Sequence, residues 1–337
     1  MTYGHGDDVF RYGDRIKYNF STNIHQNVDH SALIGHLASI GDIFKNYPEP
    51  EAESVEELIA NILSINKDNV FVTNGATEAI YLIAIMAQGK RSAIVVPTFR
   101  EYQDACSVFR HNVSFISSPL EIPSDCDLVW ICNPNNPTGR AYDADIMLSI
   151  IEANPDKLFV VDQAYSDYSI KPTLSPKVMD KLDNIILLYS LTKRFAVPGL
   201  RIGYSVGHKK ILDNLKKYRM PWSVNSIAIA SALYLLQNRN DYHIDADGLH
   251  KEIIRISKAF TDMGLIVTPS DCNFILVELP DRSAAQLKSW MIDNYGILIR
   301  DASNFECLGI RHFRVAAQSE AENDILINAV RKWITLS

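Results

Sequence analysis

A lysine, two hydroxyl side chains and an arginine follow one strongly apolar stretch of the chain. Residues 185–188 are all apolar, Ser190, Thr192 and Lys193 come directly after them, and Arg201 lies eight residues beyond the lysine. A lysine at the end of a buried strand needs an anionic partner, or it has the lowered pKa of a Schiff-base amine. Lys193 could instead extend its ammonium group into solvent, but the hydroxyls and Arg201 would then be unexplained. The pattern favours a functional lysine.

A carboxylate ends another apolar stretch. Asp162 closes the predicted strand KLFVVD (157–162), and Tyr165 follows three residues later. A lone buried carboxylate is costly unless it is paired. Asp162 could cap the next helix, or it could face a cation that comes from outside the protein.

Two loops contain small or amide residues directly after predicted strands. In TNGATEAI (73–80), free amides from Gly75 onward at a helix N-terminus would suit a phosphate group. The alternative is a plain strand-to-helix turn, because no complete GxGxxG or Walker pattern is present. In CNPNNPTG (132–139), the amide of Asn136 could be held rigidly, although these residues also favour ordinary turns.

These residues need a scaffold that gathers strand ends, and the chain predicts one. Apolar runs of strand length alternate with helical patterns, which is typical of a mostly parallel, doubly wound α/β sheet of seven strands. In such sheets ligands bind at the carboxyl ends of the strands. The predicted strands are NVFVT (69–73), SAIVVP (92–97), NVSFI (112–116), DLVWIC (127–132), KLFVVD (157–162), NIILLYS (184–190) and RIGYSV (201–206).

The pattern changes after MPWSVN (220–225). Two long helical stretches come first, followed by shorter strands and helices, and the last helix opens with a capping box at Ser319 and Glu322. We therefore expect a large α/β domain over residues 46–222 and a smaller α+β domain over residues 223–337. The first 45 residues contain no long periodic element, and we expect residues 1–45 to pack on the small domain or at a subunit boundary. Strands of the small domain are predicted near 264–268, 273–278, 297–300 and 311–316, with a helix from about 283.

Composition excludes several classes of protein. The 337 residues carry a formal charge of −7, which argues against a nucleic-acid binder because no basic stripe is present. No apolar run approaches the length of a membrane span. The polar N-terminal segment is unlike a signal peptide, and five scattered cysteines without metal-ligand spacing indicate reduced thiols, so we expect a cytoplasmic protein without a metal site.

The order of the four features resembles the fold-type I enzymes that use pyridoxal 5'-phosphate, and specifically the class I/II aminotransferase family, over nearly the whole chain. The resemblance implies that Lys193 forms a Schiff base with the cofactor and then moves a proton. It implies that Asp162 pairs with the ring nitrogen of the cofactor. Asn136 and Tyr165 would contact the ring hydroxyl.

The resemblance also implies a site for the cofactor phosphate and a second subunit. Phe99 would stack on the ring, although it could equally be a core residue. Tyr47 in NYPEP looks like the family residue that reaches the neighbouring subunit's cofactor, which implies a homodimer with shared active sites. The phosphate would be held by Gly75, Ala76, Thr77, Ser190, Thr192 and Arg201.

Substrate contacts follow from the same resemblance. Arg314 in HFRVAAQS matches the arginine that grips the substrate carboxylate in a bidentate manner. Arg300 could bind a second anionic group, or it could be an exposed arginine. Asn23, in STNIHQN (21–27), falls in the N-terminal segment that contributes to the substrate site.

Within the family, the chain is most similar to the branch of threonine-phosphate decarboxylase and histidinol-phosphate aminotransferase. SLTKRFAVPGLRIGY and MPWSVN look more like the decarboxylase. HGDD (5–8) replaces a glycine-rich HGGN, STNIHQN lacks the expected proline, and Gln318 replaces an arginine. Each change weakens a possible anion contact.

Three functions follow from this pattern. The leading hypothesis is an aminotransferase for a small, possibly phosphorylated, amino-acid-like substrate. The second is decarboxylation of a phosphorylated hydroxy-amino acid. The same residues could serve either reaction, because the bond that breaks is the substrate bond held perpendicular to the cofactor ring. The third, a non-catalytic binding protein of the same fold, fits poorly because Lys193, Asp162, Tyr165 and Arg201 are all present.

Overall fold

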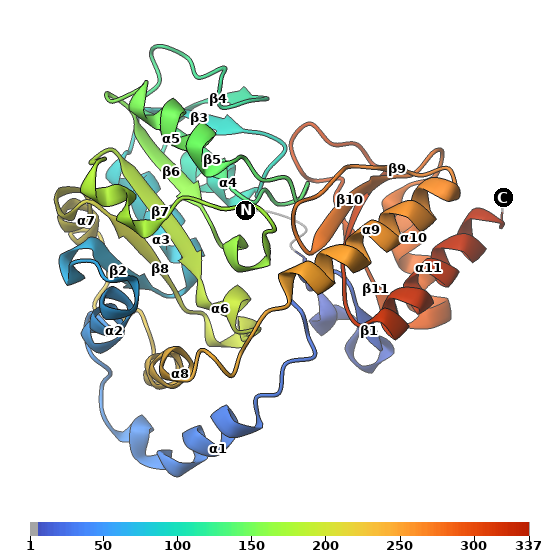
Figure 1. The fold of residues 1–337 in the computed structure, drawn as a ribbon, viewed down its shortest axis with the longest axis horizontal. Helices are drawn as coiled ribbons and strands as arrows, with labels where there is room; N and C mark the ends of the chain where they lie inside the picture. The colour runs from blue at the N-terminus through green and yellow to red at the C-terminus, as the bar shows by residue number, and fades with distance from the viewer. Residues whose placement is uncertain (1–5, 337) are drawn as a thin grey trace.

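A seven-stranded sheet forms the centre of the larger part of the chain (Figure 1). The computed structural model describes residues 6–336, so His5 of the HGDD segment lies outside the described residues. All strands run parallel except β8, which is antiparallel to both of its neighbours. The prediction of a mostly parallel seven-stranded sheet is confirmed. In spatial order the strands are β2 (Val70–Thr73), β8 (Gly203–Gly207), β7 (Ile185–Ser190), β6 (Leu158–Asp162), β5 (Leu128–Cys132), β3 (Arg91–Val95) and β4 (Asn112–Ile116).

Helices cover both faces of this sheet, which explains why its strands read as continuous apolar runs. Trp130 and Val160 belong to a core with α3 (Gly75–Met86), α4 (Glu101–Val108) and α7 (Lys209–Lys216). Their chain neighbours Val129 and Phe159 point to the other face, where they pack with α5 (Ala144–Glu152).

A further core joins α8 (Ser226–Gln237) to the large sheet. Its residues pack with α2 (Glu53–Leu63) and with Val70 and Val72 of β2. The sequence pattern predicts that the smaller domain begins at residue 223 and so contains α8, whereas the packing places α8 on the large sheet. We therefore propose a boundary between the units after α8.

The first 45 residues contain one helix that the sequence analysis did not predict. This helix, α1 (Ser31–Ser39), lies against α8 at the bottom of the view in Figure 1, where His36 stacks on Tyr234 at 4.7 Å between ring centroids. Only Leu33 of α1 is buried, so the helix lacks the apolar periodicity that would reveal it in the sequence.

The C-terminal unit is an antiparallel sheet covered by helices. Its strand order is β12-β13-β10-β9, and β1 (Tyr18–Asn19) pairs in parallel with β11 (Ile297–Leu298) beside it. The capping box at Ser319 and Glu322 is confirmed. The other elements are α9 (Ala246–Asp262), β9 (Ile266–Val267), β10 (Phe274–Glu278), α10 (Ala284–Tyr295), β12 (Arg300–Asp301), β13 (His312–Ala316) and α11 (Glu320–Ile334).

One predicted strand begins later than expected. The sequence analysis started it at Arg201, but β8 starts at Gly203, and Arg201 has a left-handed backbone with φ of 52°. The turn directs the guanidinium toward Gly75 instead of into the sheet. Between residues 6 and 336, no helix combines the length and apolarity that crossing a membrane requires.

Candidate active site

Most of the predicted site residues line one cavity. It has a volume of about 340 Å³ and lies between the carboxyl ends of the large sheet and the C-terminal unit. Residues from the N-terminal segment, including Gly6 and Asp7, also line it. The predicted residues that it brings together are Asn23, Phe99, Asn136, Tyr165, Lys193, Arg201, Arg300 and Arg314.

Lys193 reaches this cavity from the short helix α6 (Leu191–Arg194), which directly follows β7. Burial, as the largest effect, and the charges of Arg314 and Arg201 together lower the pKa of its amine to about 8, against the opposing effects of Asp7 and Asp162. Its Nζ lies 5.7 Å from the centroid of the Tyr165 ring. An amine with this pKa is partly neutral near physiological pH, as a nucleophile must be.

Asp162 ends β6, and two hydrogen bonds hold its carboxylate. The hydroxyl of Tyr102 donates to Oδ2 at 2.7 Å, and the backbone N–H of Ala164 donates to Oδ1 at 2.9 Å. Burial raises the pKa of Asp162, while these bonds and the charge of Lys193 favour the ionised form. The next helical turn begins only at Ser166, so helix capping does not explain the aspartate.

Tyr102 is a site residue that the sequence analysis missed. It is fully buried and stacks on Trp130 with 5.4 Å between ring centroids. A signal was present, because Tyr102 follows Phe99 by three residues in PTFREY, a spacing that places two side chains on one side of a helical turn. Phe99 lies edge-on to Tyr102 at 5.8 Å and lines the cavity.

The residues of the predicted phosphate site, which we call the anion cradle, lie where α3 and β8 approach each other closely. A Cβ atom at Gly75, which has φ of 75°, would lie 2.6 Å from Arg201 Nη2, and one at Gly203 would lie 2.7 Å from the backbone nitrogen of Ala76. Glycine at both positions therefore lets the first turn of α3 approach β8 and the Arg201 guanidinium closely.

Two hydroxyls complete this cradle. Ser190 Oγ and Thr192 Oγ1 lie 2.7 Å apart, and both side chains are buried. Backbone amides, hydroxyls and a guanidinium together form a donor set that suits an anion such as phosphate.

Arg300 and Arg314 stand directly opposite each other across the β12–β13 ladder. They are 8% and 4% exposed, so the alternative that Arg300 is an exposed arginine is wrong. Burial lowers the pKa of Arg300 to about 10 and that of Arg314 to about 9.

Both guanidiniums are held by neutral groups. Arg314 donates to Asn136 Oδ1 and to the backbone oxygen of Ser21, while Arg300 donates to Asn304 Oδ1 at 2.7 Å and to the backbone oxygen of Asp301 at 2.6 Å. Within residues 6–336, neither forms an ion pair with a carboxylate. Because an unpaired buried cation is costly, these two arginines are suited to an anionic ligand.

Asn23 and Tyr165 lie close to these arginines. Burial raises the pKa of Tyr165, and the charge of Arg314 and the Asn23 amide act to lower it. Within the described residues, neither polar atom of the buried Asn23 amide forms a hydrogen bond of regular geometry. An unsatisfied buried amide is ready to bind a ligand.

Tyr47 does not line this cavity. Its side chain is 85% exposed and contacts Trp222, with 5.3 Å between ring centroids. Its position leaves the predicted role toward a neighbouring subunit as an expectation.

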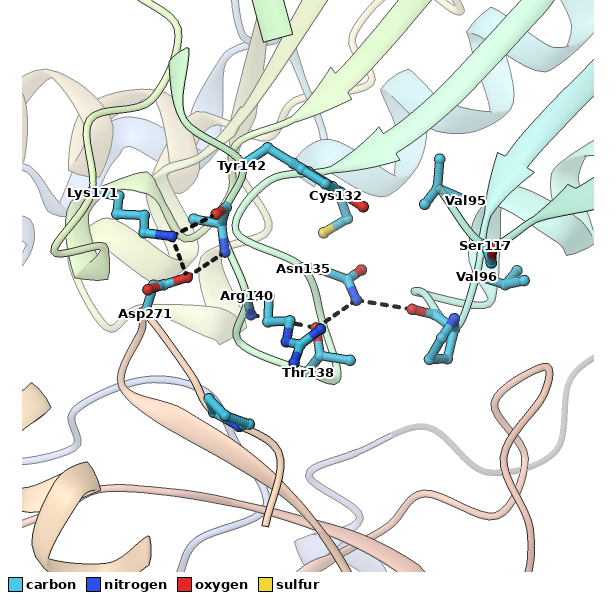
Figure 2. A pocket seen from close by; sticks show the side chains of 13 residues that line it. Val95, Val96, Ser117, Cys132, Asn135, Thr138, Arg140, Tyr142, Lys171 and Asp271 are labelled. Carbon is cyan, nitrogen blue, oxygen red and sulfur yellow. Dashed lines mark hydrogen bonds and ion pairs between the residues drawn. The ribbon is translucent and has the colours of Figure 1, made fainter. Parts of the chain in front are cut away.

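A second cavity, of about 370 Å³, is lined in part by residues of the loop 133–142 (Figure 2). Its polar side chains are mostly paired with one another: Lys171 lies 3.3 Å from Asp271, and Asn135 donates to Thr138. Burial raises the pKa of the Cys132 thiol, so the cavity offers no activated nucleophile. The cavity that contains Lys193 is therefore the stronger candidate for the active site.

A family comparison agrees with this geometry. The model of the family described as aminotransferase class I and II matches residues 17–330. The chain belongs to this family.

Individual relatives carry out two reactions. The chain is 32% identical over 325 residues to a histidinol-phosphate aminotransferase of Caldanaerobacter subterraneus, covering 89% of each chain. It is 33% identical to the solved L-threonine-O-3-phosphate decarboxylase from Porphyromonas gingivalis, with a TM-score of 0.92, covering 94% of this chain and 99% of that one. A histidinol-phosphate aminotransferase from Sinorhizobium meliloti, solved in complex with pyridoxal-5'-phosphate, is 19% identical with a TM-score of 0.85, covering 100% of this chain and 96% of that one.

Enzymes of this family use pyridoxal 5'-phosphate, and the residues of this chain fit that cofactor. A Cβ atom would fill the anion cradle at Gly75 or Gly203. The Lys193 amine has a lowered pKa, and the buried Asp162 carboxyl group accepts hydrogen bonds from two donors that favour its ionised form. An anion site, a reactive amine and a buried anion are the three features that the cofactor's phosphate, aldehyde and ring nitrogen require.

Proposed function

We propose that this family member transfers the amino group of a small substrate that carries a second anionic group. The observation that supports this most directly is the pair of buried guanidiniums of Arg300 and Arg314, held by neutral groups on one side of the cavity. A substrate with two separated anionic groups, or with a phosphate that spans both arginines, matches them.

The chain's residues would divide the work as follows. The cofactor supplies an electron-accepting ring. Asp162, which accepts hydrogen bonds from Tyr102 and Ala164, would hold a positive charge on the ring nitrogen. The amine of Lys193 would take the proton from the α-carbon of the substrate, since a neutral amine is a base. It would then deliver that proton to the neighbouring carbon, which belongs to the cofactor.

The remaining contacts would position the cofactor and the substrate. The cradle formed by Gly75, Ala76, Thr77, Ser190, Thr192 and Arg201 would anchor the cofactor phosphate. Asn136 and Tyr165 would contact the ring hydroxyl, and Phe99 would stack on the ring. Asn23 and Arg314 would orient the substrate so that its C–H bond is the one that breaks.

A half-reaction assay tests this proposal. The holoenzyme is mixed with histidinol phosphate or threonine phosphate, and the conversion of the cofactor to its amine form is followed by absorbance. We expect conversion with at least one of these amines, and reversal when a 2-oxo acid is added. Turnover without any 2-oxo acid, accompanied by carbon dioxide, would contradict transamination.

Decarboxylation is the second candidate, and the high structural similarity to the decarboxylase from Porphyromonas gingivalis favours it. The same residues would serve, but the substrate would be turned so that its carboxylate, instead of its hydrogen, stands perpendicular to the ring. Release of one carbon dioxide per threonine phosphate consumed would establish this alternative.

We also propose a homodimer with shared active sites. The exposed pair of Tyr47 and Trp222 supports it, because large aromatic side chains in contact on a surface are typical of interfaces. In such a dimer Tyr47 would approach the cofactor phosphate of the partner.

A further inference from the structure

Asp7 and Asp8, the two carboxylates of the HGDD segment, have no part in the function proposed above. Asp8 forms an ion pair with Lys288 at 2.7 Å, whereas Asp7 lines the cavity that contains Lys193. Among the described residues that line this cavity, Asp7 is the only one with a carboxylate. The cations that line it are Lys193, Arg100, Arg201, Arg300 and Arg314.

Local contacts hold Asp7 at the cavity. Its backbone N–H donates to Ser21 Oγ at 3.1 Å, and its Oδ1 accepts a hydrogen bond from Asn19 Nδ2 at 2.6 Å. Its φ of 60° lies in the left-handed region, which aspartate tolerates better than most residues. The residue is exposed, and within residues 6–336 its carboxylate forms no ion pair. Asp7 is therefore a fixed negative charge that a ligand can reach.

This charge acts on the reacting amine. Of the charges that raise the pKa of Lys193, that of Asp7 has a larger effect than that of the buried Asp162. A carboxylate that stabilises the protonated form of one amine also attracts any other cationic nitrogen that enters the same place.

The proposed substrate brings such a nitrogen. An amino group is largely protonated near neutral pH, and the substrate nitrogen must reach the position of the Lys193 amine in order to react. The arginines that line the cavity attract the anionic groups of a substrate, but they repel its ammonium group. Among the described lining residues, only Asp7 offers this group an opposite charge.

We infer that Asp7 binds the ammonium group of the incoming substrate and so selects amines for this cavity. The inference rests on the proposed function and deepens it, because it assigns a residue to the amino end of the substrate. The hydrogen bond from Asn19 involves Oδ1, so Oδ2 can accept one from the ammonium group.

Two small reagents test the inference by separating charge from access. Methylamine is a cation at physiological pH, whereas methoxyamine is neutral, and the nitrogen of each displaces the Lys193 amine from the carbonyl carbon of the cofactor. Neither reagent carries an anionic group, so the result depends neither on the arginines nor on the identity of the natural substrate. The measured quantity is the second-order rate constant of each reagent with the holoenzyme, followed by absorbance.

The variants are Asp7→Asn and, as a matched control, Asp14→Asn. Asparagine keeps the shape of the Asp7 side chain, tolerates the left-handed backbone, and can still accept the hydrogen bond from Asn19. Asp14 belongs to the same N-terminal segment, where it lies in the 3-10 turn η2 (Gly13–Arg15). It is exposed and does not line the cavity.

We expect Asp7→Asn to lower the rate constant with methylamine by about 3-fold to 10-fold, as for the loss of a partly exposed charged contact. The rate constant with methoxyamine should change by less than about twofold, because a neutral nitrogen gains little from the carboxylate. Asp14→Asn should change neither rate constant. Molar salt should reduce the effect of Asp7→Asn, since salt screens exposed charges.

The outcomes distinguish this inference from the proposed function. Equal losses with both reagents would mean that Asp7 only shapes the loop, and an unchanged rate with methylamine would mean that it does not meet the amine. Either result would overturn the inference and leave the proposed function intact. A wild-type holoenzyme that reacts with neither reagent would contradict the proposed function and the inference together.

Discussion

At the scale of single residues, the cavity depends on charges that oppose one another around Lys193. Arg314 and Arg201 act to lower the pKa of its amine, and Asp7 and Asp162 act to raise it, while burial is the largest effect. Such a balance is sensitive to single substitutions. Substitutions of the residues that raise or lower the pKa of Lys193 therefore test its assigned role directly.

The first prediction concerns the pH dependence of cofactor uptake by the apoprotein. Because burial lowers the pKa of Lys193 to about 8, the neutral, reactive amine becomes more abundant as the pH rises, and the rate should increase up to about pH 8 and then level off. Arg314→Gln removes a like charge and should move this midpoint upward, whereas Asp162→Asn should move it downward. The rate is measured by visible absorbance; a rate that does not change with pH would contradict the assignment.

The second prediction concerns Tyr102. Tyr102→Phe removes one of the donors to Asp162 and should weaken cofactor binding by about 1–2 kcal/mol, roughly 5-fold to 30-fold, because a charged acceptor loses a hydrogen bond. Tyr81→Phe is the matched control, since the Tyr81 hydroxyl donates to Glu101 at 3.0 Å. Equal cofactor affinity in the two variants would mean that Tyr102 only fills space.

At the scale of elements, the junction of β2, β8 and α3 determines whether the anion cradle exists. β8 must pass close enough to the first turn of α3 that a side chain on Gly203 would meet the backbone of Ala76 and Tyr189, each at 2.7 Å. The cradle is thus a consequence of backbone packing and not only of the side chains that line it.

The third prediction follows from this close approach. Gly203→Ala should destabilise the fold by about 1–3 kcal/mol, because the backbone must shift to accept the methyl group, and it should also weaken cofactor binding. Gly199→Ala is the control, since a Cβ there meets no atom within 4 Å, and it should change the unfolding free energy by less than about 0.5 kcal/mol. Denaturant unfolding of both variants measures this difference, which should vanish if β8 does not pass so near α3.

Periodicity and turn residues were enough to predict most of the elements, whereas Phe99, Arg300 and Arg314 were assigned to the candidate site from the family resemblance. The seven strands were found because helices bury both of their faces, which leaves long apolar runs in the sequence. The α8 helix was grouped with the C-terminal residues because an apolar face does not indicate which surface covers it, and in the folded chain α8 packs on α2 and β2. Arg100 and Tyr102 were missed because their partners, Asn304 and Asp162, are distant in the sequence and meet them only in the folded chain.

At the scale of the whole molecule, the cavity lies between the two units of the chain. Arg100 and Asn304 meet across this boundary on one side of the cavity, and Lys171 and Asp271 do so behind the loop 133–142. In the proposed homodimer, the exposed Tyr47 would contribute to the site of the second copy.

The fourth prediction concerns this second copy. Light scattering should give a mass of about twice the 38.0 kDa of one chain. Tyr47→Phe should preserve that mass and weaken cofactor binding by about 0.5–1.5 kcal/mol, since one hydrogen bond to the partner's cofactor phosphate is lost. A monomer that binds the cofactor fully would refute the shared site.

The most direct measurement of the central assignment locates the cofactor on the chain. The holoenzyme is reduced with borohydride, digested and analysed by mass spectrometry, with Lys193→Ala as the control. We predict one pyridoxyl phosphate group, attached to the Lys193 amine, and no attachment in the variant. A label on a different lysine, or an unlabelled wild-type protein saturated with cofactor, would contradict this assignment.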